Sequence, residues 1–238
     1  MKTRAALRWH VFATSEQLAA AVVEAIRAQS ALAIRERQAF HVVLAGGTTP
    51  REIYRRLAQL PLDWDRWHVY FGDERCLPDG APDRNDTMAF DAWLGHVPIP
   101  RAQIRTMPSD SEAGALESYA RELGAAGTFD LVLLGLGEDG HTASLFPGAE
   151  VAEPAQGGDV LAVLDAPKAP ARRISMSANR LSRARGVFFL VSGAGKRGAL
   201  ADLRDGADIP AACISSATGV VDVYADEDAM PTQSVAGL

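Results

Sequence analysis

The chain has 238 residues, 47% of them hydrophobic, and a formal net charge of -6, which is typical of a globular protein with a large core. This acidic balance argues against nucleic acid or an anionic membrane as the main partner, because both carry negative charge. The two cysteines fit neither a disulfide framework nor a metal site, and no apolar run approaches the ~18 residues of a membrane span, so we expect a cytoplasmic protein.

Apolar runs and segments of helical periodicity alternate through the first half of the chain. In chain order, the predicted elements are a strand at 9–13, a helix capped by Thr14, a strand at 39–45, a helix with Thr49 as its cap and Pro50 at its first position, a strand at 67–71, and helices at 86–94 and 112–123.

The second half continues this alternation around one irregular stretch, residues 141–159. The predicted strands are 129–134, 160–164, 174–178, 186–191 and 220–224, and a helix is expected after 192–196. Alternating strands and helices predict an α/β fold with an open, mostly parallel sheet and helices on both faces. Because no repeat or linker interrupts the pattern, we expect one domain over residues 1–238.

Four loops of unusual composition follow predicted strands, at residues 46–49, 73–75, 135–141 and 192–196. In open α/β sheets, ligands bind outside the carboxyl ends of the strands. We therefore expect these loops to meet in one cleft.

His141 is the candidate for proton transfer, because it follows Asp139 in a glycine-rich loop and histidine exchanges protons near neutral pH. No HxH, HxxxH or HExxH spacing suggests a metal site. Gly135, Gly137 and Gly140 also match the dinucleotide fingerprint. The Pro- and Gly-rich sequence after Gly140, however, does not favour the helix that this fingerprint requires.

An anion site is indicated at residues 46–49. Gly46 and Gly47 allow close approach of the backbone, and Thr48 at a helix start offers a hydroxyl and an N–H group. The same sequence would also fit an ordinary strand-to-helix turn with a threonine cap and no anion site. Arg173 and Lys196 are the candidate cations for this anion, although each would also fit a solvated surface charge.

Taken together, the loops resemble the 6-phosphogluconolactonase family. The motifs that carry the resemblance are AGGTTP at 45–50, FGDERCLP at 71–78 with Asn85 downstream, LGLGEDGHTASLFP at 134–147, RIS at 173–175, and SG with Lys196 at 192–196. The related glucosamine-6-phosphate deaminases usually have Asp-Glu-Tyr where this chain has Asp-Glu-Arg at 73–75. One departure is Arg84, because lactonases often have serine before the downstream asparagine.

The resemblance implies a Rossmann-like sheet and a cofactor-free hydrolysis of 6-phosphoglucono-δ-lactone to 6-phosphogluconate in the oxidative pentose phosphate pathway. His141 would act as general base on water, and Asp139 would orient it or hold sugar hydroxyls. Phosphate would lie on the 46–49 loop between Arg173 and Lys196. The other expected substrate contacts are Asp73, Arg75, Asn85 and Gly140.

Three other functions fit parts of the pattern. In a sugar-phosphate isomerase or deaminase, Asp73 would abstract a proton next to a carbonyl. A non-catalytic sugar-phosphate sensor would use the same anion site without turnover, and a nucleotide-dependent oxidoreductase would use the glycine fingerprint. No partner beyond a small sugar-phosphate lactone is expected, and the sequence leaves the oligomeric state open, with a monomer as one possibility.

Overall fold

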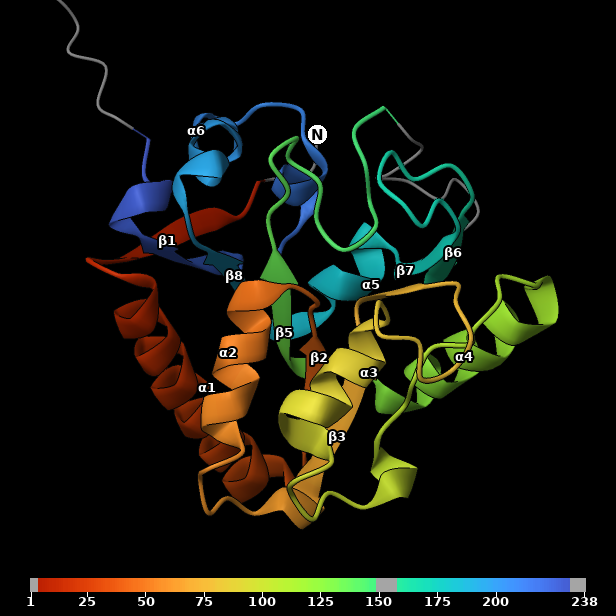
Figure 1. Cartoon of the computed structure of the whole chain (residues 1–238). Helices are drawn as coiled ribbons and strands as arrows, with labels where there is room; N and C mark the ends of the chain where they lie inside the picture. Colours follow the sequence, from red (N-terminus) through yellow and green to blue (C-terminus); the bar gives the residue numbers. More distant parts are fainter. Residues whose placement is uncertain (1–3, 149–157, 232–238) are drawn as a thin grey trace, which may run out of the picture.

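The computed structural model describes residues 4–148 and 158–231, so part of the stretch expected to be irregular, 149–157, lies outside the described residues. A six-stranded sheet forms the centre of the molecule (Figure 1). In spatial order, its strands are β1 (Ala6–Phe12), β9 (Val220–Asp226), β8 (Ala184–Val191), β5 (Phe129–Gly135), β2 (Phe40–Leu44) and β3 (Trp67–Phe71). Every neighbouring pair is parallel, as the alternation of strands and helices predicts.

A second, antiparallel sheet lies beside the first. Its strands, in spatial order, are β4 (Asp73–Arg75), β7 (Arg173–Met176) and β6 (Val160–Val163). The sequence predicted strands at 160–164 and 174–178 but gave no sign that they leave the main sheet, because pairing partners are not encoded in short apolar runs. The second sheet places Arg75 opposite Arg173, and Asp73 opposite Ser175.

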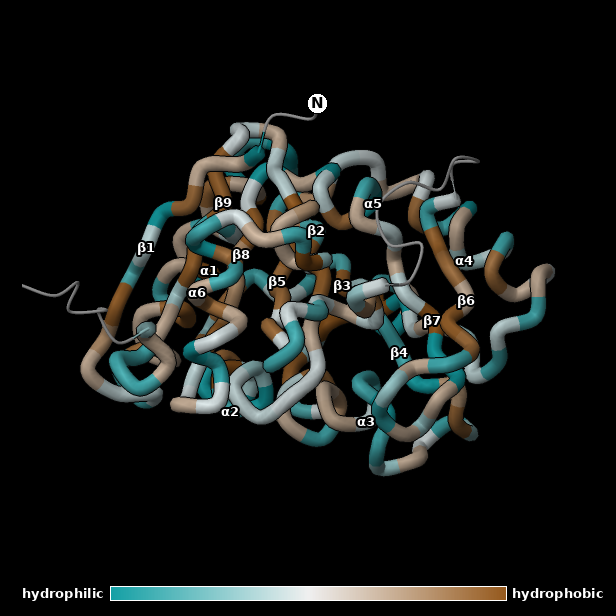
Figure 2. Tube along the Cα trace, turned by 90° about the horizontal axis from the view of Figure 1, so that it is seen from above, coloured by the Kyte–Doolittle hydropathy of each residue, from teal (hydrophilic) through white to brown (hydrophobic). Residues whose placement is uncertain are grey.

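Helices cover both faces of the main sheet, with α2 and α3 on one side and α5 on the other (Figure 2). The helices are α1 (Ser15–Arg37), α2 (Thr48–Leu57), α3 (Asn85–Ala89), α4 (Ala113–Ala126), α5 (Ala178–Ser182) and α6 (Arg197–Asp205). By length and composition alone, α1 could cross a membrane. Its Leu18, Val22 and Ile26 side chains, however, are buried in the core.

The two predicted helix caps have different outcomes. Thr14 caps α1 as expected, because its hydroxyl accepts a hydrogen bond from the N–H of Gln17 at 3.3 Å. The expectation of Thr49 as the cap of α2 was wrong. Gly47 is the cap, at φ 109°, and the N–H of Arg51 donates to its carbonyl at 3.1 Å. Glycine adopts this positive φ readily, so the helix begins earlier than the threonine suggested.

The prediction of a loop at 73–75 was wrong, because these residues form β4; the strand order nevertheless brings β4 and the other three expected loops to one edge of the main sheet. The loop after β5 lies between the loops after β8 and β2, and β3 follows on the far side of β2. Neighbouring strands lie about 5 Å apart, so the ends of the four strands β8, β5, β2 and β3 span only about 15 Å.

Candidate active site

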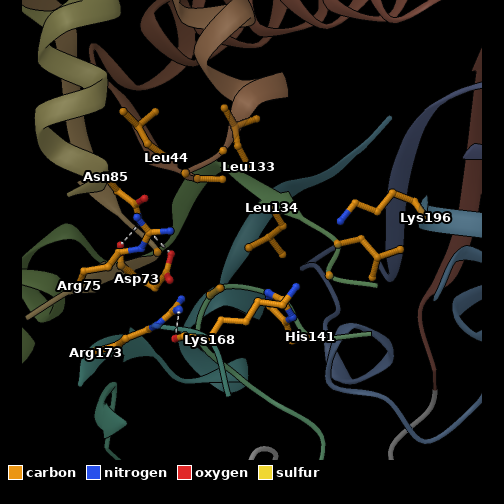
Figure 3. A pocket seen from close by; sticks show the side chains of 18 of the residues that line it. Leu44, Asp73, Arg75, Asn85, Leu133, Leu134, His141, Lys168, Arg173 and Lys196 are labelled. Carbon is orange, nitrogen blue, oxygen red and sulfur yellow. Dashed lines mark hydrogen bonds between the residues drawn. The ribbon is translucent and has the colours of Figure 1, made fainter. Parts of the chain in front are cut away.

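A cavity of about 430 Å³ opens where these loops meet (Figure 3). Eight of the residues singled out in the sequence line it: Gly46, Gly47, Asp73, Arg75, Asn85, His141, Arg173 and Lys196.

Three further candidates do not line this cavity: Thr48, Asp139 and Gly140. Thr48 is exposed in the first turn of α2. Asp139 contacts the cavity through His141. Gly140 is buried with φ 82°, and a Cβ there would come within 2.7 Å of Ile209. Its place in the loop is therefore explained by backbone conformation and packing.

His141, which lines the cavity, forms a hydrogen-bonded pair with Asp139. Nδ1 of His141 lies 2.5 Å from Oδ1 of Asp139, and the backbone N–H of His141 donates to the same oxygen at 3.2 Å. Burial alone would raise the pKa of Asp139, but these hydrogen bonds outweigh it and lower that pKa. An ionised Asp139 holds Nδ1 as a donor, which leaves Nε2 of His141 as the proton acceptor.

Two packing contacts fix this pair. The imidazole ring of His141 lies 4.7 Å from the ring of Phe146, centroid to centroid. Gly137 also lies against the pair, because a Cβ there would overlap the imidazole and lie 2.6 Å from Oδ1 of Asp139. Glycine at this position is therefore required by the close approach of the pair to the backbone.

Asp73 is held on the opposite wall by two side chains. The hydroxyl of Ser144 donates to its Oδ2 at 2.6 Å, and Nδ2 of Asn85 donates to its Oδ1 at 3.2 Å. Asn85 in turn lies over Gly46, where a Cβ would come within 2.6 Å of its Cγ. Because both carboxylate oxygens already accept hydrogen bonds, Asp73 is better placed to hold a ligand hydroxyl than to remove a proton from carbon.

Positive charge lines the cavity on two sides. Figure 3 shows Arg75 and Arg173 next to Asp73 and Asn85, whereas Lys196 lies on the far side of His141. Arg173 and Lys196 therefore line the same cavity from different sides. Burial and, to a lesser extent, repulsion from Arg75 lower the pKa of Arg173, although Asp73 opposes this effect.

Lys168 is a cavity residue that sequence reasoning missed. Arg173 holds the loop that carries it, because Nη2 donates to the carbonyl of Lys168 at 2.8 Å and Nε donates to that of Pro170 at 3.1 Å. The available signal was a lysine between two prolines in the connection from one predicted strand to the next, which is weak evidence for a site.

The glycine loop does not form a dinucleotide site. The N–H of Gly137 donates to the carbonyl of His141 at 2.8 Å, which closes the loop on itself. Thr142 and Leu145 then form a tight bridge, and no helix begins between Gly140 and residue 148, where the described segment ends. The fingerprint requires a helix at its third glycine.

Comparisons with known proteins identify close relatives. The profile of the family described as "Glucosamine-6-phosphate isomerases/6-phosphogluconolactonase" matches residues 13–223. The 6-phosphogluconolactonase of Synechocystis sp. is 41% identical over 182 residues, which cover 72% of this chain and 74% of the relative. That of Mycobacterium leprae is 38% identical over 207 residues, covering 81% and 82% of the two chains. The crystal structure of Thermotoga maritima 6-phosphogluconolactonase matches with a TM-score of 0.86, 25% identity, and coverage of 93% of this chain and all of that chain.

Proposed function

The chain belongs to the glucosamine-6-phosphate isomerase/6-phosphogluconolactonase family, and from this premise we propose that it hydrolyses 6-phosphoglucono-δ-lactone to 6-phosphogluconate in the oxidative pentose phosphate pathway. The observation that carries the proposal is the His141–Asp139 pair beside a cavity with cations on two sides. The substrate has two groups that need positive charge, a phosphate and a lactone carbonyl that becomes an oxyanion.

In the proposed mechanism, Nε2 of His141 accepts a proton from water as the water oxygen attacks the lactone carbonyl. Asp139 orients the imidazole and stabilises the imidazolium that forms. When the tetrahedral intermediate collapses, the ring oxygen leaves and takes the proton from His141. The product carries a new carboxylate and a new hydroxyl, so water is the only other reactant and no cofactor is needed.

The two positive sides of the cavity suggest how the substrate lies. Lys196 and the start of α2 at Gly47 would hold the phosphate, because α2 has no side-chain cap and its first N–H groups remain available. Arg75 and Arg173 would stabilise the developing oxyanion, and Asp73 and Asn85 would hold sugar hydroxyls. This assignment keeps every expected cation in the site but separates Arg173 from the phosphate.

The runner-up is a sugar-phosphate isomerase or deaminase, to which the family description also extends. That chemistry needs a base next to the substrate carbonyl. The hydrogen bonds that Asp73 accepts from Ser144 and Asn85 already engage both of its carboxylate oxygens, which favours the lactonase. A non-catalytic sensor would not need the hydrogen-bonded His141–Asp139 pair.

We also propose that residues 1–238 form one domain. A single cluster of buried apolar residues includes members of both sheets, among them Val132 of β5 and Ile174 of β7.

Continuous acid release from freshly prepared 6-phosphogluconolactone tests the proposal. We expect a rate that is proportional to protein concentration and well above spontaneous hydrolysis. A rate equal to the background would contradict the lactonase function, and ammonia release from glucosamine 6-phosphate would support the deaminase instead.

A further inference from the structure

Arg84 lies beneath the cavity wall and joins three segments of chain. It is 1% exposed. Its Nε and Nη2 donate to the two carboxylate oxygens of Asp86 at 2.9 and 2.6 Å. Nη2 also donates to the carbonyl of Met107 at 2.9 Å, and Nη1 donates to that of Leu77 at 3.1 Å. A short side chain with one donor, such as serine, could not make these contacts.

Glu74 is the buried partner of Arg84 and connects β4 to α3. Its Oε2 lies 4.0 Å from Nη2 of Arg84. Its Oε1 accepts hydrogen bonds from the N–H groups of Arg75 and Asn85 at 2.8 and 2.7 Å, and its Oε2 accepts one from Asp86 at 2.8 Å. One carboxylate therefore fixes the backbone of two cavity residues that lie ten positions apart in the chain.

The loop between these residues is also fixed at both ends. Nη1 of Arg75 donates to the carbonyl of Asp83, and Arg84 holds Leu77 as described above. The N–H of Arg84 donates to the carbonyl of Ala81 at 3.0 Å. These bonds hold the loop in place between Arg75 and Asn85, the two cavity residues that it connects.

We propose that Arg84, acting through Glu74 and Asp86, is a positioning residue that sets the geometry of the substrate-binding wall formed by Asp73, Arg75 and Asn85. Arg84 does not line the cavity, so it acts through Glu74, through Asp86 and through its own hydrogen bond from Nη1 to the carbonyl of Arg75 at 3.5 Å. The inference rests on the proposed function and adds to it a determinant of substrate affinity outside the family motifs. A displacement of about 1 Å in such a wall can cost about 10²-fold in activity.

The test compares Arg84→Lys with a matched control, Arg180→Lys. Lysine keeps the charge but loses the planar fork that reaches several acceptors at once. Arg180 is likewise 1% exposed and lies against Phe129, outside the cavity lining. For each variant, the measurements are kcat and KM for the lactone, the pH profile of kcat, the melting temperature, and binding of 6-phosphogluconate by calorimetry.

We expect Arg84→Lys to lower kcat/KM by roughly 10- to 100-fold, mainly through KM, with the pH profile of kcat unchanged. Arg180→Lys should lower the melting temperature but leave kcat/KM within about twofold of wild type. Asp86→Asn is a milder change that keeps the size of the side chain, and it should also raise KM. This variant decides the question if Arg84→Lys does not fold.

The proposal is overturned if the Arg84 and Asp86 variants lose only melting temperature, as the control does, and keep the wild-type KM. If wild type does not hydrolyse the lactone, the proposed function fails, and 6-phosphogluconate binding decides this inference. Weaker binding by Arg84→Lys than by Arg180→Lys supports the positioning role, whereas equal binding, or no binding by wild type, overturns it.

Discussion

The imidazole of His141 lies directly over Gly137, so a side chain at residue 137 would occupy the space of the ring. Gly137→Ala should therefore displace His141 and Asp139 and lower kcat by about 10²-fold, with little loss of fold. The control is Gly198→Ala in α6, where a Cβ would meet nothing within 4 Å. Steady-state kinetics and circular dichroism of both variants check this, and a wild-type kcat for Gly137→Ala would show that the pair need not lie where it does.

Removing the proposed base tests the chemical step. His141→Ala should lower kcat by about 10²- to 10⁴-fold, the usual contribution of general base catalysis, with little change in the affinity for 6-phosphogluconate. Asp139→Asn should lower kcat less, because the imidazole remains but loses its ionised partner. Initial rates corrected for spontaneous hydrolysis measure both effects. A near-normal kcat for His141→Ala would exclude it as the base.

Lys196 and Arg173 should respond differently to the phosphate of the substrate. Lys196→Ala is expected to raise KM for the phosphorylated lactone by roughly 10-fold and to leave that for glucono-δ-lactone nearly unchanged, because the charge would contact only the phosphate. Arg173→Ala should impair hydrolysis of both lactones, since its guanidinium would face the carbonyl and also holds the loop of Lys168. If Arg173→Ala raised KM for the phosphorylated lactone alone and Lys196→Ala impaired hydrolysis of both lactones, the phosphate would lie beside Arg173.

Glu74 should make stability depend on pH. Burial raises its pKa from 4.5 to about 7, although the three N–H donors oppose this shift. The folded state then binds more protons than the unfolded state between these values, so this residue's contribution to stability falls as pH rises through that window. From pH 5 to pH 8, the free energy of unfolding of wild type should therefore fall by about 1–3 kcal/mol relative to that of Glu74→Gln, which has no group to titrate at this position. Urea unfolding at both pH values measures it, and a constant difference would mean that the pKa is not raised.

Local signals were enough to predict most of the fold. The parallel sheet follows from apolar runs such as 129–134 alternating with helical periodicity, and β5 (Phe129–Gly135) lies where this run predicts it. The separate sheet of β4, β7 and β6 could not be predicted in this way, because it depends on pairing between segments about 100 residues apart. The cap of α2 was misplaced because threonine is a frequent cap and the glycine before it has no side chain to read.

The candidate site was predicted less completely than the fold. Its strand-end residues were identifiable because glycines and charged residues interrupt apolar runs there, as at Gly46 and His141. Lys168 was missed because it lies in a connection with no such contrast. Arg173 begins β7 of the second sheet, whereas Lys196 follows β8 of the main sheet, and no short motif predicts how the two sheets place them.

The pairing of β4 with β7 sets Arg75 directly opposite Arg173, an arrangement in which two like charges repel across neighbouring strands. Without an anion, the two guanidinium groups repel each other, and a small anion bound between them would reduce this repulsion. The protein should melt at a higher temperature in phosphate than in a zwitterionic buffer of equal ionic strength. The buffer chosen for storage or crystallisation would therefore decide whether the anion-free or the anion-bound form of the site is observed.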